Sequence, residues 1–121
     1  MLEKGMLPIG VMFNEERLRL FTLRPLKVKD TFSAQASPDA DRLGDENMLG
    51  LYLLGRRLTI DGLPPELICL DFMLDLYDGD LAEIMAADGR LANAVSSFRG
   101  QQNGIAAQAG AGADDDGLFR G

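Results

Sequence analysis

The chain of 121 residues contains no histidine and no tryptophan, and it has a single cysteine. Without histidine, Ser-His-Asp and Cys-His catalytic arrangements are excluded, and so are zinc sites that need an imidazole ligand. The cysteine, Cys69, can form no disulfide within the chain, and its apolar neighbours predict a small buried side chain. We therefore expect a reduced, non-enzymatic protein with no catalytic residue, no metal site and no cofactor.

Long apolar runs are missing as well. The longest one, Met48–Leu54, is interrupted by Gly50, whereas a membrane span needs about 20 apolar residues. The first five residues lack the basic region and apolar core of a signal peptide. We expect neither a membrane span nor a membrane partner.

Positive charge is scarce: the chain has 12 Lys and Arg residues and 19 Asp and Glu residues, which give a formal net charge of −7. Nucleic acids and anionic membranes bind cationic faces, so no nucleic acid is expected as a partner. Acids dominate residues 61–88, which contain no Lys or Arg, whereas bases cluster over 17–29 and at 56–57. One end of the fold should be acidic and the other basic, which suits either solvated faces or recognition of a basic amphipathic helix.

A β-hairpin is predicted near the beginning of the chain. Residues 6–13 and 17–24 alternate apolar and other side chains with a period of two, and Asn14 suits the turn between them. A lone hairpin is marginal in water, so helices should cover its apolar face. The first helical pattern, over 27–36, is weak.

Three stronger helical signals follow. Asp45 suits the N-cap of a helix over 46 to about 58, and a Pro-Pro pair opens a helix over 64–77. Asp80 is expected to cap the next helix, with Glu83 as its capping-box partner. The chain is thus predicted to be α+β, with an N-terminal β-hairpin packed on three to four α-helices.

The composition changes near residue 100. Residues 100–121 are rich in Gly, Ala and Gln, include three successive aspartates and show no sustained periodicity. Their Gly-rich run does not follow a strand, so a dinucleotide site is not expected there. We predict one interaction domain over 1–99 and a flexible, disordered tail over 100–121.

The two acidic helices are predicted to bind a partner protein. Flexible methionines suit surfaces that accept varied helices, although core packing remains the alternative for the same side chains. Apolar candidates are expected to contact the partner, and aspartates are expected at the rim. The candidates are Phe72, Met73, Leu76, Ile84, Met85, Asp71, Asp75 and Asp80.

Four segments, taken in order, resemble a known family. They are Leu23-Arg24-Pro25-Leu26-Lys27-Val28-Lys29-Asp30, Leu54-Gly55-Arg56-Arg57-Leu58-Thr59, Gly62-Leu63-Pro64-Pro65-Glu66-Leu67-Ile68 and Leu74-Asp75-Leu76-Tyr77-Asp78-Gly79. Their order and type are similar to those of the tail assembly chaperones of Mu-like and P2-like bacteriophages. The resemblance covers roughly residues 9–91.

This resemblance implies a chaperone that performs no catalysis. Proteins of the family bind the tape-measure protein in the host bacterial cytoplasm while the tail tube polymerises around it, and they are absent from the mature virion. The tape-measure protein is therefore the expected partner, with the tail tube protein as a further candidate. A homo-oligomer is a further alternative, because the edge strand of a hairpin can pair with the same strand of another copy.

Other classes of protein fit the same composition. The alternatives are a small structural virion protein of the tail or of head completion, and an acidic inhibitor that mimics nucleic acid. A virion component stays in purified particles, whereas a chaperone does not. A charge mimic loses its partner steeply with added salt, because exposed charges are screened within about 8–10 Å near physiological ionic strength. An enzyme of unrecognised type is the third alternative.

Overall fold

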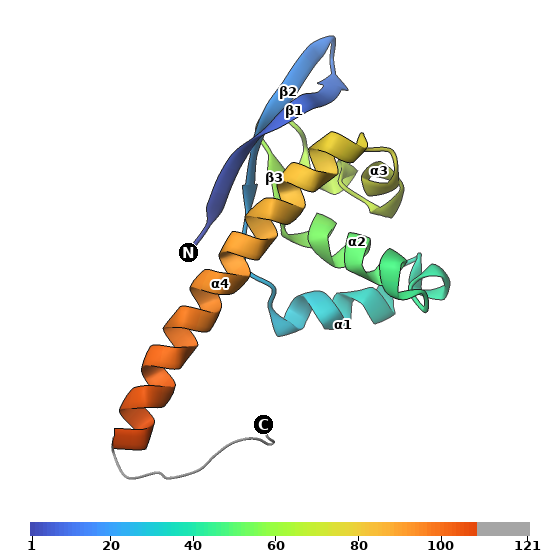
Figure 1. Cartoon of the computed structure of the whole chain (residues 1–121). Coiled ribbons are helices and arrows are strands. Elements are labelled where there is room, and N and C mark those ends of the chain that lie inside the picture. The colour runs from blue at the N-terminus through green and yellow to red at the C-terminus, as the bar shows by residue number, and fades with distance from the viewer. Residues whose placement is uncertain (109–121) are drawn as a thin grey trace. The chain divides into compact units, whose positions relative to one another are not determined.

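The computed structural model of the chain describes the backbone of residues 1–108 and the side chains of residues 1–98. The chain divides after Leu91 into two units, and the first unit holds the whole sheet (Figure 1). The fold is α+β, as predicted, with an N-terminal hairpin packed against helices. The strands and helices are β1 (Glu3–Phe13), β2 (Glu16–Leu23), α1 (Val28–Ala36), α2 (Glu46–Arg57), β3 (Leu58–Ile60), α3 (Leu70–Leu74) and α4 (Asp78–Gln108).

The hairpin closes with a two-residue turn, Asn14-Glu15. Both residues have positive φ, at 50° and 66°, and Phe13 pairs with Glu16 across the turn. This conformation matches the right-handed twist of the strands, and asparagine tolerates it better than most residues. The turn predicted at Asn14 is therefore confirmed.

A third strand was missed by the sequence analysis. β3 pairs antiparallel with β2, so the sheet order is β1-β2-β3. The predicted helix over 46–58 ends at Arg57, because Leu58 is extended and its side chain is buried with Ile60 on the same face of the sheet. A strand of three residues is too short to show the alternation of apolar and polar side chains by which strands are predicted.

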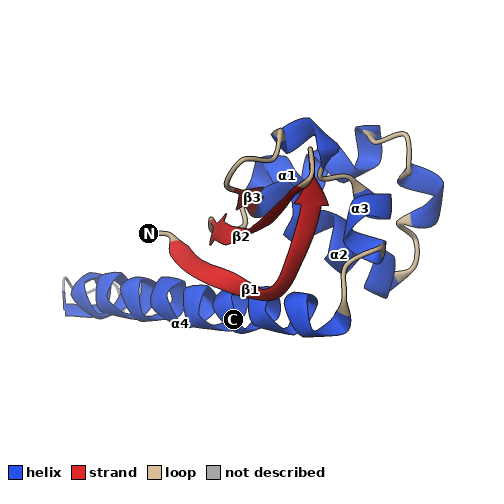
Figure 2. Ribbon diagram, turned by 90° about the horizontal axis from the view of Figure 1, so that it is seen from above, coloured by secondary structure: helices blue, strands red, loops and turns tan. Residues whose placement is uncertain are grey.

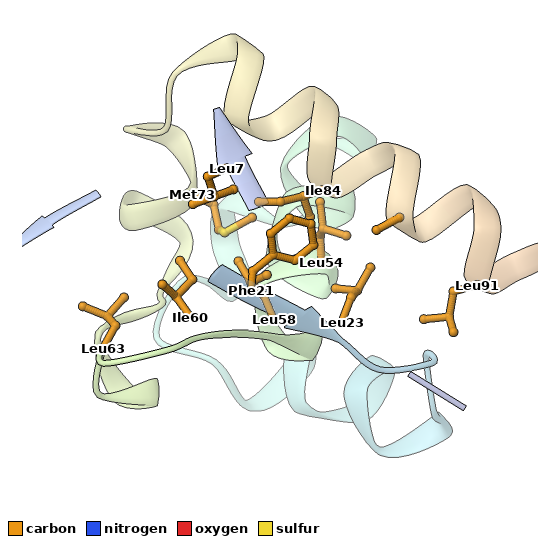
Figure 3. Close-up of a cluster of buried hydrophobic side chains, with 11 residues drawn as sticks. Leu7, Phe21, Leu23, Leu54, Leu58, Ile60, Leu63, Met73, Ile84 and Leu91 are labelled. Carbon is orange, nitrogen blue, oxygen red and sulfur yellow. The ribbon is translucent and has the colours of Figure 1, made fainter. Parts of the chain in front are cut away.

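The core lies on one face of the sheet, under α3 and the first turns of α4 (Figure 3). Phe21 is central, and its ring covers Gly5 of β1 so closely that a Cβ there would lie 2.6 Å from Cζ of Phe21. Burial of these large apolar side chains is the main stabilising term. The members of the cluster are Leu7, Phe21, Leu23, Leu54, Leu58, Ile60, Leu63, Met73, Ile84, Ala87 and Leu91.

Helix α2 begins as predicted. The Asp45 carboxylate accepts hydrogen bonds from the backbone N–H groups of Asn47 (2.7 Å) and Met48 (3.3 Å), which satisfies two free donors of the first turn. The helix contacts both α1 and α3. A second small cluster, formed by Ala34, Leu43 and Leu70, lies beside it.

Gly50 lies in the middle of α2, where it lowers helix stability. A Cβ at this position would meet no atom within 4 Å. Gly50→Ala is therefore expected to raise the free energy of unfolding by about 0.5–1 kcal/mol, because alanine loses less backbone entropy in a helix. Urea unfolding measures the change. Gly89→Ala, an equally open position in α4, should give a similar gain, and a loss at Gly50 alone would contradict the open geometry.

An ion-pair network joins the ends of β2 and α1. The buried Asp30 carboxylate accepts from both terminal nitrogens of Arg24, at 2.6 and 2.9 Å, and from the backbone N–H of Lys27 at 2.8 Å. The hydrogen bond from Arg24 is the largest cause that lowers the pKa of Asp30 from 3.8 to about 2. Asp30 therefore carries a charge whose hydrogen-bond partners are all within the protein.

Arg57 extends this network toward α4. Its Nε donates to the carbonyl of Arg24 (3.0 Å), and its Nη2 contacts Asp88 at 2.6 Å. The backbone N–H of Arg24 donates in turn to the carbonyl of Arg57 at 3.1 Å. Arg24, Asp30 and Arg57 all belong to segments that carry the family resemblance, and in this structure they hold elements together.

The third predicted helix is much shorter than expected. Pro65–Leu67 forms a 3-10 turn, and α3 then spans only Leu70–Leu74. Cys69 immediately precedes α3 and is exposed, so the prediction of a buried cysteine was wrong. Apolar neighbours in the sequence do not bury a residue when the chain turns between them.

Helix α4 begins at Asp78 and continues to Gln108. Residues 100–108, which the sequence analysis assigned to a flexible tail, belong to α4. Residues 109–121 lie outside the described residues, so the tail stays a prediction there. Among residues 1–108, no helix is both long and apolar enough to cross a membrane.

Candidate functional site

A bulge in β1 shapes the surface near the hairpin turn. The pairing of β1 with β2 shifts between Met6 and Val11, and Gly10 lies at φ 93° inside the shift. Glycine adopts this left-handed conformation without steric penalty, and Pro8 has no N–H to lose from a ladder. The bulge therefore removes β1 from regular pairing and leaves backbone groups that need other partners.

Asp80 supplies the partners for the N–H groups of the bulge. Its carboxylate accepts from Ile9 N at 2.8 Å and from Gly10 N at 2.9 Å, and its side chain is 0% exposed. The expectation that Asp80 caps its helix was wrong, because α4 already begins at Asp78. The carboxylate reaches across to β1 instead, which lies beside α4 in Figure 2.

Two arginines of β2 satisfy the carbonyl groups of the same bulge. Arg19 Nε donates to the carbonyl of Leu7 at 2.8 Å, and Arg17 Nη1 donates to the carbonyl of Ile9 at 2.9 Å. Side chains from β2 and α4 thus supply hydrogen bonds to the backbone of β1 where the ladder is interrupted. The result is a bent β1 held against the first turn of α4.

A cavity of about 510 Å³ opens between the bent strand and the segment joining α3 to α4. Met12 and Tyr77, each 61% exposed, both line this cavity and give it exposed apolar surface. We call this cavity the hairpin groove. Its lining residues are Gly10, Val11, Met12, Arg17, Phe72, Asp75, Leu76, Tyr77 and Asp80.

The structure brings four of the eight predicted partner-binding residues into this groove. They are Phe72, Asp75, Leu76 and Asp80. Asp80, however, is buried and bound to the β1 backbone, so its predicted place on an exposed rim was wrong. Phe72 and Leu76 pack partly against the core and partly face the groove.

The other four candidates lie elsewhere. Met73 and Ile84 are 1% and 0% exposed in the core, so their prediction as partner contacts was wrong. Asp71 is exposed and pairs with Arg42 at 3.1 Å, outside the hairpin groove. Met85 is exposed on α4 and lines a different cavity. Apolar residues that face the core and apolar residues that line a groove recur at the same helical spacing, so the sequence does not distinguish them.

The second cavity, of about 420 Å³, lies between α2 and α4. Leucines of both helices and Met85 line it, together with Gly50, where a Cβ would meet no atom within 4 Å. We call it the helix groove, and it shares no lining residue with the hairpin groove. Its lining residues are Glu46, Asn47, Gly50, Leu51, Leu54, Arg57, Leu81, Met85 and Asp88.

The chemistry of the hairpin groove favours binding. Asp80 and Nη1 of Arg17 are bound to the backbone of the bulge. The other N–H donors of Arg17, the Asp75 carboxylate and the Tyr77 hydroxyl are the polar side-chain groups that a ligand can reach. Among the described residues, no three His, Cys, Asp or Glu side chains gather as a metal site. Met12, Arg17 and Tyr77 line the groove but were not among the predicted partner-binding residues, although Pro8 and Gly10 inside a strand are signals of a bulge.

Compared with models of protein families, with curated proteins and with solved structures, the chain matches none of them. The resemblance to tail assembly chaperones therefore remains a hypothesis from the sequence.

Proposed function

We propose that the chain is a non-catalytic binding domain that holds an apolar segment of a partner protein in the hairpin groove. The observation that carries this proposal is the pairing of exposed Met12 and Tyr77 with the half-buried Phe72 and Leu76 along one cavity. Apolar clefts with a few polar groups are the usual form of a binding site.

The groove combines a stable wall with an adaptable one. Hydrogen bonds from Arg17 and to Asp80 hold the strand wall, so its shape is set before a partner arrives. Met12 has a flexible thioether side chain that fits varied shapes, and the Tyr77 ring offers a large contact with few rotatable bonds. Such a groove suits the apolar stripe of an amphipathic helix.

The family resemblance makes this proposal more specific. We propose that the partner is the tape-measure protein, and that the chain acts as a tail assembly chaperone in the host bacterial cytoplasm. A tape-measure protein is a long helical chain that exposes apolar stripes before the tail tube encloses it. Covering these stripes would prevent aggregation, because exposed apolar patches associate.

Co-expression of the chain with the tape-measure protein of the same source tests the proposal. The wild type is expected to keep the tape-measure protein soluble and to co-purify with it. The double variant Met12→Ala/Tyr77→Ala should weaken capture by about tenfold or more, because exposed aromatic anchors contribute most at interfaces. Both side chains are exposed, so folding should be unchanged in circular dichroism spectra.

Leu20→Ala is the matched control, since Leu20 is half exposed on β2 and lies outside the hairpin groove. It should capture the tape-measure protein as the wild type does. If the folded wild type leaves the tape-measure protein insoluble and unbound, the chaperone proposal fails. If the wild type binds and the groove variant binds equally well, the function stands and the site is wrong. Recovery of the chain in purified particles would instead favour a virion component.

A further inference from the structure

No contact within the chain explains why residue 50 is a glycine. It lies in the middle of α2, is exposed, and has empty space where a Cβ would stand. Glycine at such a position destabilises a helix by about 0.5–1 kcal/mol relative to alanine. Its missing side chain does, however, widen the helix groove between α2 and α4, where Met85 is also exposed. An approaching side chain from outside can use this space.

Glu46 gives the rim of the helix groove a negative charge outside any ion pair of the described residues, whereas Asp88 is paired with Arg57. Glu46 is exposed in the first turn of α2, and Asp88 lies on α4. Arg57 is the cation among the lining residues, but its side chain is 8% exposed and held by Asp88 at 2.6 Å. An occupant with an apolar centre and positive flanks would therefore match this groove.

The outward face of α1 combines exposed apolar side chains with positive charge. Phe32 and Val28, one helical turn apart, are 64% and 72% exposed. Lys27 and Lys29 are exposed beside them, and Asp30, the acid of this helix, is buried in its pair with Arg24. The face is thus apolar at its centre and cationic at its flank. It points away from its own α2, because α1 buries Asp30 and Ala34 on its inner side.

We propose that the helix groove receives the outward face of α1 from a second copy of this chain. Phe32 enters the groove where Gly50 leaves room, Val28 contacts the apolar wall at Met85, and Lys29 pairs with Glu46. Each copy carries both the α1 face and the groove, so the contact builds a self-associating species. The hairpin groove stays open in it, so this inference goes beyond the proposed function and does not depend on it.

Sedimentation velocity over about a hundredfold range of concentration tests the proposal. The wild type is expected to show species heavier than the monomer at high concentration. Phe32→Asp and Gly50→Trp should each raise the dissociation constant by about tenfold or more, since one removes the aromatic anchor and the other fills its site. Leu20→Asp and Gly79→Trp, at exposed positions outside both α1 and the helix groove, should associate as the wild type does.

A mixture of the two deficient variants gives the sharper result. Phe32→Asp keeps an intact groove and Gly50→Trp keeps an intact α1 face, so together they should form a one-to-one complex that neither forms alone. Lys29→Glu and Glu46→Lys should likewise weaken association singly and restore it when combined in one chain, which covers the case that Gly50→Trp misfolds. A wild type that stays monomeric throughout, or Phe32→Asp and Glu46→Lys variants that associate as the wild type does, would overturn the proposal.

Discussion

Asp80→Ala is expected to lower the free energy of unfolding by about 3–5 kcal/mol, the largest effect of any single substitution considered for this chain. The substitution leaves the N–H groups of Ile9 and Gly10 without the carboxylate that they donate to at 2.8 and 2.9 Å. Hydrogen bonds to a charged group contribute about 1.5–3 kcal/mol each, and unsatisfied buried donors add to the loss. Urea unfolding monitored by circular dichroism measures the change.

Two further variants separate the hydrogen bonds of Asp80 from its position at the start of α4. Asp80→Asn keeps the size and one acceptor oxygen, so it should lose roughly half as much stability as Asp80→Ala. Asp78→Ala removes an exposed carboxylate from the same helical turn and should cost about 1 kcal/mol or less, through the helix dipole alone. Equal losses at Asp78 and Asp80 would contradict the bond across to β1.

Asp30→Ala is expected to lower the free energy of unfolding by about 2–4 kcal/mol. It removes the acceptor of both Arg24 nitrogens and of the Lys27 N–H, in a network where the carboxylate is fully buried. Arg24 then keeps only backbone carbonyl partners, at Pro25 and Arg56. Thermal and urea unfolding measure the loss. Asp39→Ala is the comparison, because its contact with Arg42 is exposed and long at 3.3 Å, and its effect should be near zero.

The same carboxylate predicts how stability depends on pH. The pKa of Asp30 is lowered from 3.8 to about 2 in the folded chain, chiefly by the hydrogen bond from Arg24. A lowered folded-state pKa stabilises the protein above the unfolded value, and the contribution is lost as pH falls through the folded value. Asp30 should therefore contribute up to about 2 kcal/mol above pH 4 and almost nothing below pH 2.

Unfolding of the wild type and of Asp30→Asn across this range measures the contribution. The stability difference between the two proteins should shrink as pH falls from about 5 to about 2. A difference that stays constant over this range would show that Asp30 is not held ionised by Arg24.

Local features of the sequence determined much of the fold. Asn14 placed the hairpin turn, Asp45 placed the start of α2, and the alternation over residues 6–13 and 17–24 placed two strands. Each signal acts within a few residues, because caps and turns satisfy neighbouring backbone groups. The α+β class follows from these signals, since an isolated hairpin needs helices to cover it.

Part of the candidate site was also predictable. Phe72, Asp75 and Leu76 were chosen from the sequence and line the hairpin groove together. Met73 lies between Phe72 and Leu76 in the chain but faces Gly55 of α2, where a Cβ on Gly55 would be 2.9 Å from Met73 Cγ. Which of the neighbouring apolar residues becomes core depends on the element packed against it, and the sequence of one helix does not contain this information.

The tertiary structure alone decided the role of Asp80 and the course of the chain around it. The sequence determined that an acidic residue stands near the start of a helix, which is true of capping residues in general. The partners of Asp80, however, are backbone N–H groups 70 and 71 residues earlier, freed by a bulge in β1. β3 is likewise a strand because β2 offers it a free edge and the core accepts Leu58 and Ile60. Signals within a few residues set turns and caps, whereas contacts between distant segments form only when the packed core brings them together.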